Sequence, residues 1–176
     1  MIDIVMFPKK ELQIMGEKLG YSKVIHYKNF NIKFGINRNF FESKKTDIIT
    51  SLETSLDKDK THYKESGLNQ VLCKLAKKNK IAIAFNFNNI LNAKKRYLIL
   101  GRIMQNIRLC RKYKIPMIIA SFANDRYDMR NPRDLISIGI SLGMTPIEAK
   151  NAVSNSIEDV LSSKDPRILA EGIRKI

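Results

Sequence analysis

The sequence predicts an α/β fold in which parallel strands alternate with helices. Residues 81–87 and 117–122 are almost wholly apolar, as expected for strands buried on both faces of a parallel sheet. Residues 93–113 between them have the apolar spacing of a long helix, so the three segments form a βαβ unit. Six or seven strands and as many helices in 176 residues fit an open doubly wound sheet or a small, irregular (β/α) barrel. A barrel typically has about 250 residues, so this chain is short for one.

The first half of the chain is predicted to contain strands joined by polar loops. A helix over residues 9–19 begins after Pro8 and ends at Gly20. Apolar and β-branched residues predict strands at 2–6, 23–27, 31–36 and 47–52, and a short one at 61–63. The polar segments 37–46 and 53–60 are expected to be loops.

Helices dominate the second half outside the two buried strands. Residues 68–78 form an amphipathic helix whose expected inward positions are Val71, Leu72, Leu75 and Ala76. The C-terminal third is predicted to be helical, because it carries several helix start signals. These are Asn131-Pro132, the capping box at 145–148, Ser156-Ile157-Glu158-Asp159, and Pro166 before a final short helix.

Size and composition predict one globular domain, residues 1–176. Apolar residues make up 44% and charged residues 28%, which argues against disorder. No apolar run approaches the roughly 18 residues of a membrane span, and no signal peptide is recognisable. We therefore expect a cytoplasmic protein with no membrane association. Cys73 and Cys110 lie in apolar helical patterns and are expected to be reduced core residues.

The charge distribution points to a polyanionic partner. Lysine and arginine number 32 against 17 acids, a net charge of +15. Residues 61–116 carry 13 bases and one acid, and no carboxylate occurs between Glu65 and Asp125. Solvated surfaces normally mix both signs, so we interpret this acid-free stretch as a surface that accepts phosphates. A stretch without carboxylates also argues against metal-assisted hydrolysis. Asn86, Asn88 and Asn89 stand where a hydrolase would place acids.

The helix over residues 93–113 concentrates these bases on one side. Its apolar face is expected to pack on the sheet, and Leu98 and Leu109 fall among the bases on the other face. Either RNA or a protein partner could meet that face, and a solvated helix is the simpler alternative. The bases plotted on it are Lys94, Lys95, Arg102, Arg108 and Lys112.

Other motifs carry less information. His26 and His62 are isolated, Ser121 has no nucleophile-elbow sequence around it, and no phosphate-binding glycine loop is present. The loop 124–130 follows a buried strand, where parallel α/β folds place ligand sites. Arg126 and Arg130 in this loop could contact phosphates or could pair with Asp125 and Asp128. The scarcity of aromatic residues favours recognition of RNA shape and backbone over base reading.

From about Ser66 onward the chain resembles archaeal ribonuclease P protein component 3, the family of the eukaryotic 30 kDa subunit. Residues 1–65 match that family only in outline. The strongest matching piece is a strand-end Ser-x-Ala, then an Arg-x-Pro-x-Asp-Leu helix start and Leu-Gly-Met. The matching segments are 67–72 (GLNQVL), 75–85 (LAKKNKIAIAF), Arg96, Tyr113-Lys114, 119–123 (IASFA), 130–135 (RNPRDL), 142–144 (LGM), Ala149, 153–154 (VS) and 160–161 (VL).

The resemblance implies a TIM-barrel-like fold related to the polymerase and histidinol phosphatase barrels. It also implies a subunit of the ribonucleoprotein endonuclease that removes the 5′ leader from precursor tRNA in tRNA processing. In that enzyme the RNA is the catalyst and uses Mg2+, so no cofactor is expected on the protein. The family protein pairs with component 2 as a dimer of heterodimers, beside other protein components. The metal-binding histidines of the phosphatase relatives have no counterpart here, and the chain is short for the family.

We therefore predict a short, irregular TIM-barrel-like (β/α) barrel with a helical C-terminal third. It would act as a non-catalytic, RNA-binding subunit of ribonuclease P, with no catalytic or metal-binding residue of its own. The alternatives are a generic basic α/β RNA-binding or assembly protein and a metal-dependent phosphoesterase. The predicted RNA-binding residues are Lys94, Lys95, Arg96, Arg102, Arg108, Arg111, Lys112, Lys114, Arg126, Arg130 and Arg133.

Overall fold

Six short parallel strands form the frame of the molecule. The computed structural model describes residues 1–7, 12–54, 59, 62, 64–162, 168–170 and 173–174. Two strands, β1 and β2, pair with each other, and a second sheet has the order β3-β4-β5-β6. The strands are β1 (Ile2–Val5), β2 (Lys23–His26), β3 (Ile32–Phe34), β4 (Ile48–Thr50), β5 (Ala82–Asn86) and β6 (Met117–Ala120).

The continuation of β6 joins the two sheets. The amide of Phe122 donates to the Ile4 carbonyl at 2.8 Å, and the amide of Met6 donates to the Ala123 carbonyl at 2.9 Å. Asp3 reinforces this seam, because its carboxylate accepts from the Ser121 amide at 2.7 Å and from the Ser121 hydroxyl at 2.6 Å. The strand order becomes β2-β1-β6-β5-β4-β3. Within the described residues β2 and β3 are not paired, so the barrel-like sheet is open there.

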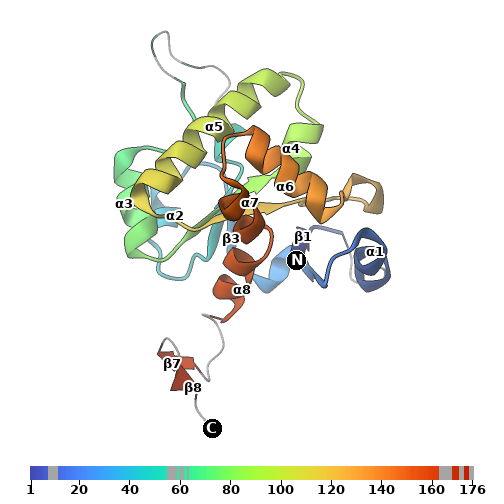
Figure 1. Cartoon of the computed structure of the whole chain (residues 1–176). Helices are drawn as coiled ribbons and strands as arrows, with labels where there is room; N and C mark the ends of the chain where they lie inside the picture. Colours follow the sequence, from blue (N-terminus) through green and yellow to red (C-terminus); the bar gives the residue numbers. More distant parts are fainter. Residues whose placement is uncertain are drawn as a thin grey trace.

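Helices connect the strands, and α3 and α5 are among those that cover the outer face of the sheet (Figure 1). Asparagine and threonine side chains start several of them: Asn69 accepts from the Leu72 amide, and Thr145 with Glu148 forms a capping box. The helices are α1 (Leu12–Leu19), α2 (Arg38–Glu42), α3 (Gln70–Lys78), α4 (Phe87–Leu91), α5 (Arg96–Tyr113), α6 (Pro132–Ser141), α7 (Pro146–Ala152) and α8 (Asn155–Ser162).

The two faces of the strands bury different cores, as the two-residue period requires. On the outer face Ile83 and Ile119 pack with Ile103 and Ile107 of α5, among others. The inner face carries small residues such as Ala82, Ala84 and Ala120, and Ile157 and Val160 of α8 pack into it. Apolar side chains therefore fill both faces of the sheet.

The fold class predicted from the sequence is confirmed, with corrections to particular elements. The segment 37–46 contains α2 instead of only a loop, and α4 begins directly after β5. The prediction of a final short helix beginning at Pro166 is wrong. The described residues there form two strands, β7 (Ile168–Ala170) and β8 (Ile173–Arg174), which pair antiparallel. Val71 is 54% exposed, not inward. The strand expected at 61–63 lies outside the described residues except for His62. No helix in the described part of the chain is long and apolar enough to cross a membrane.

Candidate nucleic-acid interface

Two neighbouring helices, α3 and α5, carry the exposed bases of the acid-free stretch. They lie in contact, and the Lys77 ammonium donates to the carbonyl of Lys114 at 3.1 Å, so the C-terminal ends of both helices meet. Lys114 ends α5 in the left-handed conformation, with φ 53°. We define the basic surface as seven exposed bases on α3, on the C-terminal half of α5 and directly after these helices, leaving out Arg111 because it is paired with Glu148. Its members are Lys74, Lys77, Lys78, Lys80, Arg108, Lys112 and Lys114.

The four lysines of α3 and its C-terminal end were missed in the sequence-based prediction. Lys74, Lys77 and Lys78 lie at the i, i+3 and i+4 spacing of one helix face, opposite the buried Leu72, Cys73 and Ala76. That spacing, inside the acid-free stretch, was the signal that could have found them. These lysines form a second row of cations beside those of α5.

Arg102 is not on an exposed face, so that part of the prediction is wrong. Its side chain is 1% exposed. The guanidinium Nε donates to the Asp59 carboxylate at 2.8 Å, and Nη1 donates to the Glu53 carbonyl at 2.8 Å. Burial alone would raise the pKa of Asp59, but hydrogen bonds from Arg102 and the Glu65 amide lower it on balance. Arg102 therefore fastens α5 to the segment after β4.

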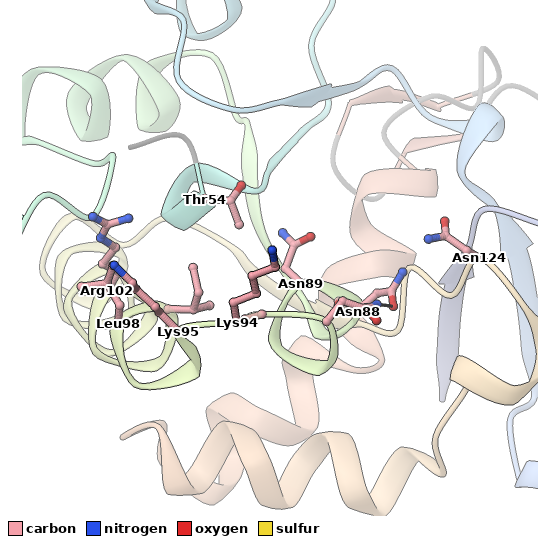
Figure 2. A pocket seen from close by; sticks show the side chains of 11 residues that line it. Thr54, Asn88, Asn89, Lys94, Lys95, Leu98, Arg102 and Asn124 are labelled. Atoms are coloured by element: carbon pink, nitrogen blue, oxygen red, sulfur yellow. Dashed lines mark hydrogen bonds between the residues drawn. The ribbon is translucent and has the colours of Figure 1, made fainter. Parts of the chain in front are cut away.

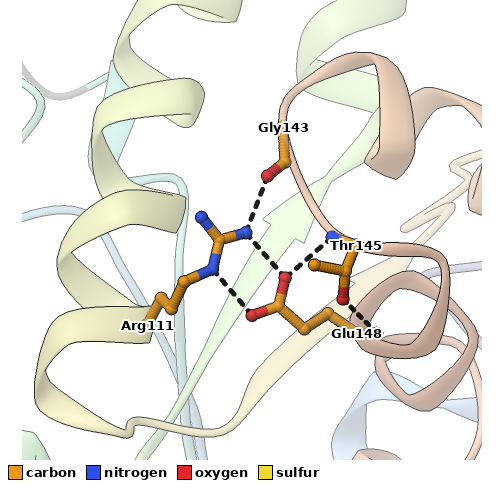
Figure 3. A network of polar contacts seen from close by, with 4 residues as sticks. All are labelled: Arg111, Gly143, Thr145 and Glu148. Carbon is orange, nitrogen blue, oxygen red and sulfur yellow. Dashed lines mark hydrogen bonds and ion pairs between the residues drawn. The ribbon is translucent and has the colours of Figure 1, made fainter.

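Arg111 is likewise held by a carboxylate from another element (Figure 3). Its Nε and Nη2 donate to the two Glu148 oxygens at 2.8 and 2.6 Å, and Nη2 also donates to the Gly143 carbonyl at 2.7 Å. The hydrogen bonds from Arg111 lower the pKa of Glu148 to about 2. Glu148 also closes the capping box with Thr145. The pair braces α5 against the turn between α6 and α7, and its positive charge is neutralised.

The remaining predicted bases at the start of α5 stay accessible. Lys94, Lys95 and Arg96 are all exposed. Arg96 donates from Nε to the Ile90 carbonyl and from Nη2 to the Leu91 carbonyl, both at 3.0 Å, which ties the end of α4 to α5. Leu109 packs against the outer core and is therefore not a free apolar group among the bases.

The loop after β6 presents two arginines supported by rings and backbone. Arg126 stacks 4.8 Å from the Tyr127 ring centroid. Arg130 donates to the carbonyls of Tyr127 and Met129 and lies 5.8 Å from the ring of Phe87. Asp125 accepts from the Tyr127 amide, capping a short 3-10 turn (Arg126–Asp128). Arg133, in the first turn of α6, is exposed.

A cavity of about 650 Å³, lined by both polar and apolar side chains, lies at the carboxyl ends of β4, β5 and β6. Figure 2 shows side chains from these strand ends and from the start of α5 around it. Asn89 donates to Ser51 and to the buried carboxylate of Glu53, whose pKa is raised by burial. The lining residues are Thr54, Asn88, Asn89, Asn92, Ala93, Lys94, Lys95, Leu98, Ile99, Arg102 and Asn124.

Cys73 and Cys110 are buried free thiols, and burial raises the pKa of Cys73 to about 11. Across the described ranges, no three His, Cys, Asp or Glu side chains are grouped so that they could hold a metal ion.

Of the predicted RNA-binding residues, the structure places Lys94 and Lys95 at the cavity and Arg108, Lys112 and Lys114 on the basic surface. It assigns Arg102 and Arg111 to ion pairs.

Comparison with known proteins shows to which family the chain belongs. The model of the family described as RNase P subunit p30 matches residues 17–169. The chain belongs to the RNase P subunit p30 family. It is 27% identical to ribonuclease P protein component 3 of Methanothermobacter thermautotrophicus over 155 residues, covering 86% of this chain and 60% of the relative. The corresponding protein of Methanococcoides burtonii is 32% identical over 143 residues, covering 79% of this chain and 56% of the relative.

The family resemblance inferred from the sequence is thereby confirmed. The chain spans about 60% or less of the length of these curated relatives. In three dimensions it is similar to a chain from the cryo-EM structure of an archaeal ribonuclease P with mature tRNA. The TM-score is 0.70 at 20% identity, and the match covers 97% of this chain and 96% of that one. This similarity supports the barrel-like fold of the p30-family chain.

Proposed function

We propose that this p30-family chain is a protein subunit of ribonuclease P that binds and stabilises the catalytic RNA. The observation that carries the proposal is the basic surface on α3 and α5, in a stretch without any carboxylate from residue 66 to 124. Lysine and arginine side chains there can neutralise phosphates and release counterions. Family membership makes ribonuclease P RNA the polyanion that best fits this surface.

In this proposal the RNA performs the cleavage of the 5′ leader and uses Mg2+, and the protein supplies positive charge and shape. Phosphates brought together by a folded RNA repel each other, and fixed cations on a rigid helix pair reduce that repulsion without a bound metal. The protein would therefore lower the Mg2+ concentration that the RNA needs. We further propose that ribonuclease P protein component 2 pairs with this chain and that precursor tRNA is the substrate of the whole complex.

A reconstitution experiment tests the proposal. Cleavage of a precursor tRNA is measured at low Mg2+ with the cognate ribonuclease P RNA and component 2, with and without this chain. We expect cleavage to require both the RNA and the chain. Binding of an unrelated structured RNA of equal length serves as the specificity control. Cleavage by the chain alone would assign the reaction to the protein as a phosphoesterase. No effect of the chain on cleavage, with equal affinity for the unrelated RNA, would favour a generic RNA-binding protein.

A further inference from the structure

The cavity at the carboxyl ends of β4, β5 and β6 combines features that the basic surface lacks. We propose that it takes up one unpaired nucleotide of a bound RNA, with the base among asparagine amides and the phosphate on Lys94 and Lys95. This inference rests on the proposed function, since it requires that the chain binds RNA. It names a second kind of contact, in which a single base is recognised instead of the backbone alone.

The size and walls of the cavity suit a nucleotide. Its volume of about 650 Å³ lies in the usual range for pockets that hold small organic molecules. Leu98, Ile99 and Ala93 supply an apolar wall against which the flat face of a base can lie. Other parts of the lining are asparagine amides and the hydroxyl of Thr54. A single nucleotide that leaves the stack fits this volume.

Asparagine side chains provide both donors and acceptors, which is what the edge of a base requires. Asn88 is 7% exposed, and its oxygen accepts from Asn92. Its amide NH2, however, donates to no group within the described parts of the chain. The Asn89 oxygen and the whole side-chain amide of Asn124 also make no hydrogen bond there. These groups can therefore bond a base without first breaking a hydrogen bond within the described protein.

The charges around the cavity favour a phosphate at its mouth. Lys94 and Lys95 are exposed, and none of the residues that line the cavity carries a carboxylate. Figure 2 shows the Lys94 side chain extending toward Asn89, from the start of α5 to the strand ends. The nearby Glu53 carboxylate accepts from Asn89, so its charge is partly satisfied from within the protein. Cations beside free amides suit a nucleotide better than either a neutral base or a bare phosphate.

Paired RNA hairpins provide the test. The affinity of the full chain is measured for a fully paired hairpin, closed by a linker without nucleotides so that no loop base is unpaired, and for the same hairpin with one bulged, unpaired nucleotide. We expect the wild-type chain to bind the bulged hairpin at least about fivefold more tightly, the effect of one good base contact. Asn88→Asp keeps the acceptor for Asn92 but removes the NH2 donor, and Asn124→Ala removes an exposed amide. Both should abolish the preference. Asn39→Ala, an exposed asparagine on α2, is the matched control and should retain it.

The outcomes separate this inference from the proposed function. If the wild-type chain binds both hairpins equally, or if both cavity variants keep the preference, the inference is overturned while RNA binding stands. If the wild-type chain binds neither hairpin but binds ribonuclease P RNA, the inference is overturned and the proposed function stands. If it binds none of these RNAs, the proposed function itself fails. Ribose 5-phosphate is the competitor that distinguishes a nucleotide site from a phosphate site. Adenosine 5′-monophosphate should displace the bulged hairpin at a lower concentration, and equal competition would overturn recognition of a base.

Discussion

At the residue scale, the surroundings of each arginine on α5 decide what it does. Arg108 is exposed, whereas Arg102 and Arg111 are held by Asp59 and Glu148. A helical period predicts which side chains leave a helix in the same direction, but not which loop covers them. Both acids come from outside the acid-free stretch, so the sequence around α5 contained no sign of them. The exposure of Lys94 and Lys95, at the start of α5, could be predicted without knowing which acids lie nearby in the fold.

The Arg111–Glu148 pair should contribute to stability in a pH-dependent way. Hydrogen bonds from Arg111 lower the pKa of Glu148 to about 2, against an ordinary value of 4.5. This stabilisation is fully present above the unfolded pKa, and it is lost as the pH falls through the folded value. Glu148→Gln should lower the free energy of unfolding by about 1 kcal/mol at pH 7 and should flatten its fall below pH 4.5.

Urea denaturation followed by circular dichroism measures this effect. The exposed i, i+4 pair Arg38–Glu42 is the control, and Glu42→Gln should cost less than about 0.5 kcal/mol. An equal cost for the two variants would show that the brace between α5 and the α6–α7 turn adds no more stability than an exposed ion pair does.

The buried carboxyl of Asp3 should have the opposite pH dependence. Burial raises its pKa to about 6 from 3.8, although hydrogen bonds from Ser121 and Ile4 oppose the rise. The folded state then binds more protons than the unfolded state between these values, so stability should fall as the pH rises from about 4 to 6. Asp3→Asn can keep the hydrogen bonds to Ser121 and should remove this decline.

Thermal unfolding of the Asp3→Asn variant across that pH range checks the prediction. Asp159→Asn, at an exposed position on α8, is the control and should follow the wild-type curve. A wild-type melting temperature that rises steadily between pH 4 and 6, unaltered by Asp3→Asn, would contradict it.

At the element scale, long periodic segments were predictable and short ones were not. The helix α5 and the buried strands β5 and β6 follow directly from apolar spacing. The five-residue helices α2 and α4 have too few residues for a period, and only their asparagine caps, Asn37 and Asn86, mark them. The pairing of β1 with the continuation of β6 depends on a contact between residues more than a hundred positions apart. No local pattern encodes that contact.

The basic surface on α3 and α5 gives a prediction for the salt dependence of RNA binding. Each lysine that contacts a phosphate contributes roughly 0.7 to 0.9 to the slope of log affinity against log salt. Lys112→Ala should therefore reduce the slope by about one, whereas Lys150→Ala on α7 should leave it unchanged. Fluorescence anisotropy titrations with ribonuclease P RNA between 50 and about 300 mM salt give the slopes. A slope that Lys112→Ala does not alter would remove this residue from the interface.

At the scale of the whole molecule, the barrel-like sheet separates two kinds of polar site. The basic surface lies on the outer helices, whereas the amide-lined cavity lies at the carboxyl ends of the strands. The sequence predicted the positive charge and the strand-end asparagines, because both are local. Their arrangement on separate surfaces required the fold. In our proposal the outer surface holds the RNA backbone and the cavity receives one of its unpaired nucleotides.

The Mg2+ requirement of the reconstituted enzyme tests most directly whether the basic surface acts as a substitute for diffusible cations. The measurement is the Mg2+ concentration for half-maximal cleavage of precursor tRNA, with the wild-type chain and with a variant in which Lys74, Lys77, Lys78 and Lys80 are alanine. Arg38→Ala, outside the basic surface, serves as the control. We predict that the quadruple variant raises the required Mg2+ at least about twofold and that added Mg2+ restores the cleavage rate. An unchanged requirement, in a variant that still joins the complex, would contradict the proposal.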